Sequence, residues 1–114
     1  MSLREAYTAV IAQGETWKAT VATEPYEAAW AGEAVFFLRL LKKGKGNLRN
    51  VRARVQISPD GMHWADEGSA LRIPADQDEV TFCRVTNFGH YLRLAATLPR
   101  GAECQVLATL SLKA

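Results

Sequence analysis

The sequence contains few of the residues that build disulfide frameworks, metal sites or catalytic centres. Its 114 residues include only two cysteines and two histidines. Two cysteines are too few for a disulfide-built scaffold, and neither has a second cysteine or a histidine at the spacing of a zinc site. Cys83 and Cys104 each lie in an apolar run, so we expect two buried thiols, with a disulfide between neighbouring strands as the alternative. No metal or other cofactor is expected.

Long hydrophobic runs are also missing. A membrane-spanning helix needs about 20 consecutive apolar residues. The longest apolar stretch, AVFFLRLL at 34–41, is much shorter and is interrupted by Arg39. The first residues, MSLREAYTAV, lack the three-part layout of a secretory signal. We therefore expect no membrane span, and a cytoplasmic or virion-associated protein.

The sequence lacks the motifs that usually carry catalysis. It contains no G-x-S-x-G, no P-loop, no G-x-G-x-x-G after a strand and no H-E-x-x-H. Paired carboxylates occur only as chain neighbours, at Asp66–Glu67 and in the acidic loop PADQDE at 74–79. General acid and base catalysis needs two carboxylates across a pocket, which neighbours in a surface loop rarely provide. We predict that the protein is not an enzyme.

The acidic loop also carries oxygen atoms of the kind that calcium prefers. The candidates are Asp76, Gln77, Asp78 and Glu79. A calcium loop of the EF-hand type would need more ligands and a glycine at its sixth position. We therefore interpret PADQDE as a solvated connection between strands.

Alternation of apolar and polar residues, the pattern of a half-buried strand, dominates what is present. The alternating runs are 16–23, 51–58, 90–98 and 104–113. Their core-facing residues should be Trp17, Ala19, Val21, Val51, Ala53, Val55, Ile57, Leu92, Leu94, Ala96, Leu98, Cys104, Val106, Ala108, Leu110 and Leu112. Three further strands are expected at 4–12, 33–41 and 79–85; of these, 33–41 is apolar on both faces, which predicts a central strand covered on both sides.

Turn signals separate these runs. They are Gly14, Glu24–Pro25, KKGKGN, SPDG, PADQDE, NFG and PRG. Strands that recur about every 10–20 residues between such turns are typical of an all-β sandwich or barrel. We predict a single domain over 1–114: an all-β, two-layer antiparallel β-sandwich of about seven or eight strands, with a jelly-roll-like order.

The stretch VQISPDGMHW, 55–64, has the composition of a hairpin turn. Pro59 sets φ for the first corner, and Asp60 and Gly61 accept the dihedral angles that follow. Trp64 is expected to start the return strand and to pack back over the sheet. We interpret the stretch as a structural hairpin rather than a ligand-binding loop.

The same stretch carries a family resemblance. Its pattern S-x-D-G-x-x-W, followed later by Y-L-R-L, resembles a hairpin and a strand of discoidin-type jelly rolls. The matching residues are Ser58, Asp60, Gly61 and Trp64, then Tyr91, Leu92, Arg93 and Leu94. In that family these residues are framework and ligands bind at loops at one end, so the resemblance implies the fold and glycan or lipid binding. Discoidin domains are longer and join their termini by a disulfide, which Cys83 and Cys104, both in the last third of the chain, do not provide.

Basic residues cluster between 42 and 54, although the net charge is only +2. The cluster has no acidic residue and consists of Lys42, Lys43, Lys45, Arg49, Arg52 and Arg54. Such a patch can hold the phosphates of a polyanion. Base-stacking aromatics are absent from it, which argues against nucleic acid. A solubilising loop whose arginines pair with nearby carboxylates, and a protein interface, are the alternatives.

Two aromatic residues are candidates for stacking on a sugar. Tyr26 and Trp30 lie in the irregular stretch EPYEAAWAGE, whereas Trp17 alternates with apolar neighbours and is interpreted as core. Carbohydrate sites commonly combine two or three exposed aromatics. Tyr26 and Trp30 therefore define a candidate glycan site.

Apolar residues on outward-facing positions favour assembly. They occur in 33–41, at Leu107 and at Ala95, and a two-layer sandwich with such residues needs a covering partner. Polar contacts of that interface are predicted at Arg39, Arg52, Arg54 and Arg93. Our first hypothesis is a non-catalytic sandwich that self-associates as a homo-oligomer such as a trimer, or joins a larger assembly, as a virion-associated or shell-decorating subunit. A carbohydrate-binding module is the second hypothesis, and polyanion binding through 42–54 is the third.

Overall fold

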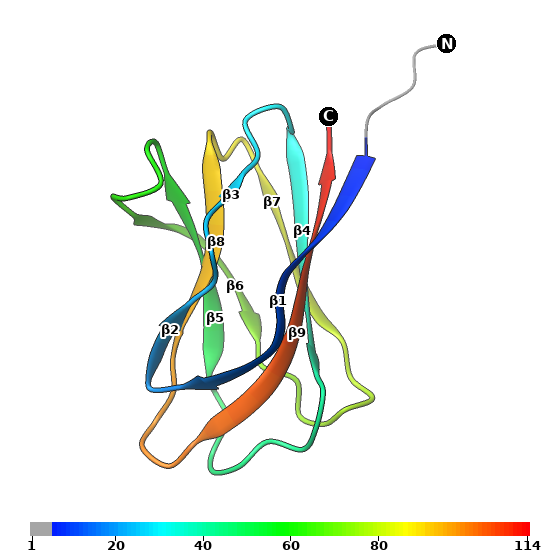
Figure 1. Ribbon diagram of the computed structural model, residues 1–114, viewed down its shortest axis with the longest axis vertical. Helices are drawn as coiled ribbons and strands as arrows, with labels where there is room; N and C mark the ends of the chain where they lie inside the picture. The colour runs from blue at the N-terminus through cyan, green and yellow to red at the C-terminus, as the bar shows by residue number, and fades with distance from the viewer. Residues whose placement is uncertain (1–5) are drawn as a thin grey trace.

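Two antiparallel sheets packed face to face make up residues 6–114, the part of the chain that the computed structural model describes (Figure 1). The strands are β1 (Ala6–Lys18), β2 (Thr20–Ala22), β3 (Tyr26–Glu27), β4 (Glu33–Leu40), β5 (Arg52–Ser58), β6 (Ala65–Arg72), β7 (Thr81–Thr86), β8 (Tyr91–Thr97) and β9 (Glu103–Lys113). One sheet has the order β1-β9-β4-β7. The other has the order β2-β8-β5-β6, with β3 also paired to β8.

The chain crosses between the sheets at every connection except β2–β3 and β5–β6. With β2 and β3 counted as one interrupted strand, this order is that of a jelly roll, in which two Greek keys interlock. The predicted all-β, jelly-roll-like sandwich is confirmed. The nine strands of residues 6–114 exceed the predicted number because β3 is too short to show alternation. None of the described residues forms a helix with the length and apolar character of a membrane span.

The core lies between the sheets and consists mainly of the residues that alternation assigned to it. Trp17, Phe36, Leu94 and Leu110 are among its fully buried large side chains. Both cysteines are free thiols that point into this layer, Cys104 buried and Cys83 half-buried. Burial raises the pKa of each thiol to about 11, with the charge of Glu67 adding to the shift at Cys83. The expectation of free thiols is confirmed, and the expected burial is found at Cys104 but only in part at Cys83.

The first two strands meet at a corner that alternation did not predict. A single strand over 16–23 is wrong: β1 ends at Lys18, and Thr20 begins β2 in the opposite sheet. Ala19 between them adopts a φ of 55°, and its carbonyl accepts a hydrogen bond from the Leu98 amide at 2.8 Å. A left-handed alanine is sterically unfavourable, so the crossover between sheets imposes this conformation.

Gly14, predicted as a turn, lies inside β1. It has a φ of 78° and stands where the register of β1 against β9 shifts between Gln13 and Glu15. Such a shift is a β-bulge, which bends a strand without ending it. The predicted strand 4–12 is therefore the first part of a longer strand, and its residues 4 and 5 lie outside the described residues.

The turn between β5 and β6 is held by its own side chains. The buried Ser58 Oγ accepts hydrogen bonds from the amides of Asp60 and Gly61, at 3.2 and 2.8 Å. Asp60 Oδ1 accepts from the amides of Met62 and His63, at 2.8 and 2.9 Å. The bond from the His63 amide, a 2.7 Å contact between His63 Nδ1 and Asp60 Oδ2, and the bond from the Met62 amide hold the pKa of Asp60 well below its usual range. The interpretation of S-x-D-G-x-x-W as a structural hairpin is confirmed.

Candidate functional site

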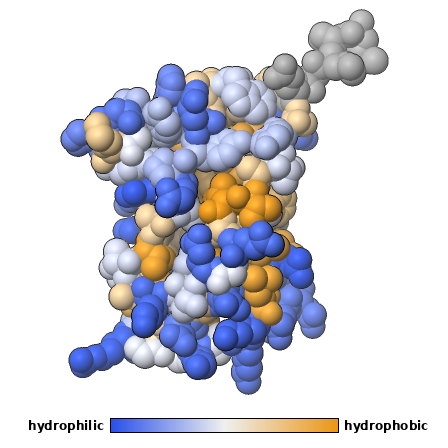
Figure 2. Space-filling model, viewed as in Figure 1, coloured by the Kyte–Doolittle hydropathy of each residue, from blue (hydrophilic) through white to orange (hydrophobic). Residues whose placement is uncertain are grey.

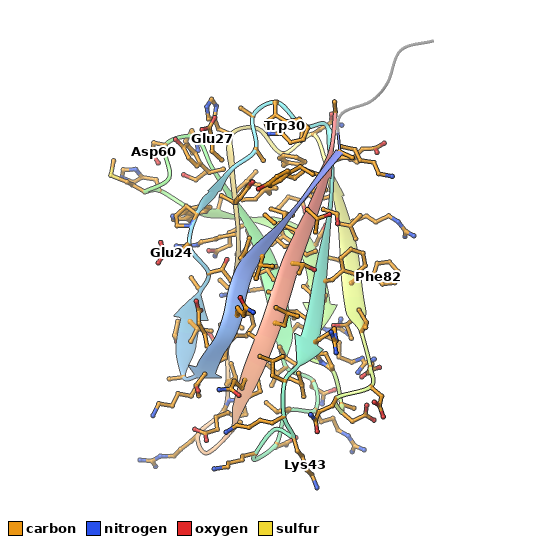
Figure 3. All side chains as sticks on the ribbon, turned by 45° about the vertical axis from the view of Figure 1, so that its right-hand side comes forward. Glu24, Glu27, Trp30, Lys43, Asp60 and Phe82 are labelled. Carbon is orange, nitrogen blue, oxygen red and sulfur yellow. The ribbon has the colours of Figure 1, made fainter. Side chains whose placement is uncertain are left out.

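The outer face of the sheet β1-β9-β4-β7 carries a row of largely apolar side chains. Val10, Thr109, Phe37 and Phe82 are direct cross-strand neighbours, so this row, apolar at every position except Thr109 and called the apolar row below, crosses all four strands. Val10 is 56% exposed and Phe82 49% exposed, and the Phe37 and Phe82 rings lie 6.2 Å apart. Phe82 points away from the sheet in Figure 3. A continuous exposed row differs from the scattered apolar residues of an ordinary surface.

Flanking rows extend this surface and place polar groups at its border. They are Thr8, Ser111, Val35 and Arg84 on one side, and Gln13, Leu107 and Arg39 on the other. The Arg84 guanidinium lies over the Phe82 ring, with Cζ 5.1 Å from the ring centroid. Figure 2 looks onto the edge of the sandwich formed by β1 and β2, and it shows apolar atoms in the middle of the molecule with mostly hydrophilic atoms toward both ends. Leu107 and Arg39 lie on this surface as predicted.

Three other predicted interface arginines, Arg52, Arg54 and Arg93, belong to the opposite sheet. Its outer face is covered by polar side chains of its own. The Arg93 guanidinium stacks on Trp64, with Cζ 4.1 Å from the ring centroid, and Arg93 Nε donates to Gln56 Oε1 at 2.8 Å. Gln56 Nε2 in turn donates to Asp66 Oδ1 at 2.9 Å. Burial by this packing lowers the pKa of Arg93.

Ala95 does not need the covering partner that the sequence predicted. It is only 5% exposed within the single chain, although it faces outward beside its cross-strand neighbours Ala22 and Arg54. Ala95 therefore gives no argument for assembly. The exposed apolar row of the other sheet does give one.

The basic segment forms the β4–β5 loop and the first residues of β5. Figure 3 shows Lys43 at the end of the sandwich opposite Trp30. A groove of about 540 Å³ at this end is lined by Lys43, Gly44, Gly46, Asn47, Leu48, Arg49, Asn50, Arg52, Arg72, Ile73, Pro74 and Ala75. Lys42, Lys45 and Arg54 do not line it; Lys45 forms an ion pair with Glu103 at 3.5 Å.

Arg72, which the sequence did not single out, completes the basic wall of this groove. It is the direct cross-strand neighbour of Arg52. Glu79 accepts hydrogen bonds from both terminal nitrogens of Arg72 and from the Ala75 amide. The Arg72 bonds, followed by the Ala75 bond, lower the pKa of Glu79 to about 2. Arg52 and Arg54 were predicted to pair with nearby carboxylates. Among the described residues, the arginine of this region that forms such an ion pair is Arg72.

Three side chains of the acidic loop are hydrogen-bonded within the protein. Asp76 Oδ1 accepts from the Asp78 amide at 2.9 Å, and Gln77 Nε2 donates to a backbone carbonyl of the β4–β5 loop at 2.9 Å. Glu79 is engaged by its ion pair. In the part of the chain that the structure describes, no three His, Cys, Asp or Glu side chains converge as metal ligands do. The loop connects β6 to β7, as interpreted.

The candidate sugar-stacking residues gather at the other end. Ala6, Tyr7, Tyr26 and Trp30 line a recess of about 390 Å³, and Trp30 is 43% exposed. Burial raises the pKa of Tyr26, and the adjoining Tyr7 side chain raises it further. The sequence missed Tyr7, because only the packing of β1 against the other sheet brings it beside Tyr26.

A family model, described as a domain of unknown function, DUF6385, matches residues 43–107. This chain belongs to the DUF6385 family. The match begins in the basic loop, includes the β5–β6 turn and ends within β9. The groove and its arginines therefore lie in the segment that defines the family model.

Two solved structures are similar to this DUF6385 protein in fold. The SPBc2 prophage-derived protein YomS has a TM-score of 0.65 at 4% identity, over 100% of this chain and 97% of that chain. The PBSX exported protein XepA has a TM-score of 0.57 at 11% identity, over 96% of this chain but only 36% of that chain. At these identities the likeness shows the fold alone. A comparison with curated proteins finds no match.

Proposed function

We propose that this DUF6385 protein is a non-catalytic structural or interaction subunit that self-associates through the outer face of the sheet β1-β9-β4-β7. The apolar row is the observation that carries the proposal. Removing exposed apolar surface from water contributes about 25 cal/mol per Å². Binding of a partner that covers Val10, Phe37 and Phe82 is therefore favoured by the hydrophobic free energy of their burial. A second copy of the chain is the partner that this face fits best.

The register of the sheet supports a self-complementary contact. A two-fold axis parallel to the strands and between β9 and β4 sets Val10 of one copy against Phe82 of the other. The same axis sets Lys113 of one copy against Glu33 of the other, because these two residues are cross-strand neighbours at the end of the face. Two-fold contacts of this kind are the commonest in homo-oligomers, and aligned sheets pack well face to face.

The two similar structures supply a biological setting for the proposal. One is named as prophage-derived and the other as an exported protein. A virion-associated or phage-encoded accessory subunit is consistent with both names and with the absence of catalytic motifs from the sequence. The setting rests on analogy of fold, whereas the interface rests on this chain's own side chains.

The test is the solution mass by light scattering over a dilution series, at low and high salt. The natural chain should have a multiple of 12.6 kDa that survives dilution, with twice that value expected for the two-fold contact. Phe82→Glu should give the monomer mass, whereas Met62→Glu, at a 74% exposed position in the β5–β6 turn, should not change the natural mass. A natural chain that is monomeric at all concentrations contradicts the proposal, and a threefold mass contradicts the two-fold contact.

The recess at Tyr7, Tyr26 and Trp30 favours a second candidate function, carbohydrate binding. Three aromatic side chains from different strands and loops surround one opening, which is how sugar rings are commonly stacked. Calorimetric titration with soluble oligosaccharides tests it. Trp30→Ala should abolish the heat of binding and Met62→Ala should leave it unchanged; equal binding by both variants contradicts a site at this recess.

A further inference from the structure

The groove at the basic end is formed by two segments that are far apart in the sequence. Eight of its lining residues lie between positions 43 and 52, and the other four are residues 72–75. Four of its lining residues are basic, namely Lys43, Arg49, Arg52 and Arg72, and none is acidic. The positive charge is therefore concentrated in a concave surface, where the field of several cations adds up.

The loop that carries Arg49 is held in shape by the neighbouring β8–β9 connection. Lys45 and Glu103 exchange two backbone hydrogen bonds, at 2.9 and 3.0 Å. Gly46 has a φ of 74°, and a Cβ there would lie only 2.5 Å from the Gly101 carbonyl oxygen. The Arg49 amide donates to Asn47 Oδ1 at 3.1 Å. The glycines thus allow close packing, so that the groove exists before a ligand arrives.

The arrangement of charges in the groove favours an anion between its walls. Arg52 and Arg72 are direct cross-strand neighbours, and like charges in that position destabilise a sheet. Glu79 neutralises Arg72 from outside the groove, since it is not a lining residue. Lys43, Arg49 and Arg52 have no such pairing among the ion pairs of the described residues. An anion held by these three residues would supply the negative charge that their surroundings lack.

We propose that this groove binds the phosphate groups of a single flexible phosphodiester chain, through Lys43, Arg49 and Arg52. Arginine suits phosphate because its guanidinium donates in a fork that matches two phosphate oxygens. None of the lining residues is aromatic, so the groove offers no surface on which a base can stack. The ligand is recognised by its backbone, and the bases of a nucleic acid contribute nothing.

The experiment compares two fluorescent oligonucleotides of about 12 units, one of thymidylate and one fully abasic, because only the first can stack. Their dissociation constants are measured by anisotropy from about 10 to about 200 mM salt. The natural chain should bind both within about threefold of each other. Three phosphate contacts predict a slope of log K against log salt of about −2.

A pair of charge-matched variants locates the contact. Arg49→Gln/Arg52→Gln removes two cations from the groove, and Arg54→Gln/Arg100→Gln removes two that do not line it. The groove variant should bind about tenfold more weakly or worse, and its salt slope should fall by about 1.4. The control variant should keep its affinity within about threefold and keep the slope.

Three outcomes overturn the proposal. They are no binding of either oligonucleotide by the natural chain at the lowest salt, equal losses in the two double variants, and much tighter binding of thymidylate than of the abasic chain. The dimer-breaking change Phe82→Glu should leave the affinity per chain unchanged, since Phe82 lies on the outer face of the other sheet and not in the groove. Failure of the self-association proposal is thereby kept separate from failure of this one.

Discussion

The two outer faces of the sandwich are both formed by antiparallel strands but differ in how their side chains are bonded. On the sheet β2-β8-β5-β6, Arg93 stacks on Trp64 and is hydrogen-bonded to Gln56, which is bonded in turn to Asp66. On the sheet β1-β9-β4-β7, the rings of Phe37 and Phe82 contact each other and the surrounding solvent.

This difference indicates which of the two faces would bind a partner. A face whose polar side chains are already hydrogen-bonded to one another has little to gain from being covered. A face with a continuous apolar row gains the hydrophobic free energy of each atom removed from water. Apolar composition of a strand is therefore insufficient evidence for an interface: Ala95 is already buried within the single chain, whereas Phe82 is not.

The largest effect is expected from one added charge on each face. Thr109→Lys places an ammonium group in the centre of the apolar row and should raise the dissociation constant of the homo-oligomer at least about 100-fold, since a buried unpaired charge at the centre of an interface is strongly unfavourable. Thr97→Lys makes the same change on an exposed, outward position of β8. Light scattering should show dissociation only for Thr109→Lys; equal behaviour of the two variants would remove the distinction between the faces.

The next effect is on the stability of the fold and arises at the polar face, the outer face of the sheet β2-β8-β5-β6. Trp64→Ala removes the ring beneath the Arg93 guanidinium and should lower the free energy of unfolding by about 2 kcal/mol, from lost burial and a lost cation–π contact. Urea denaturation measures it. Trp30→Ala, at the exposed recess, is the control and should have a clearly smaller effect. The mass in solution should not change in either variant.

A smaller effect on stability is expected at the hydrogen bonds that link Arg93, Gln56 and Asp66. Gln56→Ala removes the acceptor for Arg93 Nε and the donor to Asp66, and should lower the free energy of unfolding by about 1 kcal/mol. Gln105→Ala, an outward glutamine on β9 of the apolar face, is the matched control. If both variants lose the same stability in urea, these hydrogen bonds contribute nothing beyond the side chain's own packing.

The smallest effect is a loss of stability at acidic pH, caused by the ion pair between Arg72 of β6 and Glu79. The pKa of Glu79 is about 2 in the folded chain, against an ordinary value of 4.5. Its ion pair with Arg72 therefore stabilises the fold fully above pH 4.5, and this contribution is lost as the pH falls toward 2. Thermal melts by circular dichroism should show a falling melting temperature over that range.

Glu79→Gln should flatten part of that pH dependence. Asp60, whose pKa is also lowered, should account for a further part, and Asp60→Asn tests this in the same melts. A natural profile that Glu79→Gln leaves unaltered would show that the ion pair does not stabilise the fold.

The sequence alone predicted most of the sandwich, because alternation records which side of a strand is buried. In β9 the residues Cys104, Val106, Leu110 and Leu112 are buried as expected, and the β5–β6 turn follows from residues within a few positions of one another. The corner at Ala19 escaped prediction, since nothing in the local pattern distinguishes it from a strand.

What the tertiary structure alone decided is which outward side chains meet. Alternation identifies Arg52 as outward, and composition places Phe37 and Phe82 in strands, but neither indicates which strand is the neighbour or in which register it pairs. Pairing of β4 with β7 and β9 makes the apolar row, pairing of β5 with β6 brings Arg72 to Arg52, and packing of β1 against the other sheet brings Tyr7 to Tyr26. The core follows from a local preference for burial, whereas these surfaces follow from contacts between strands distant in sequence, which no local preference encodes.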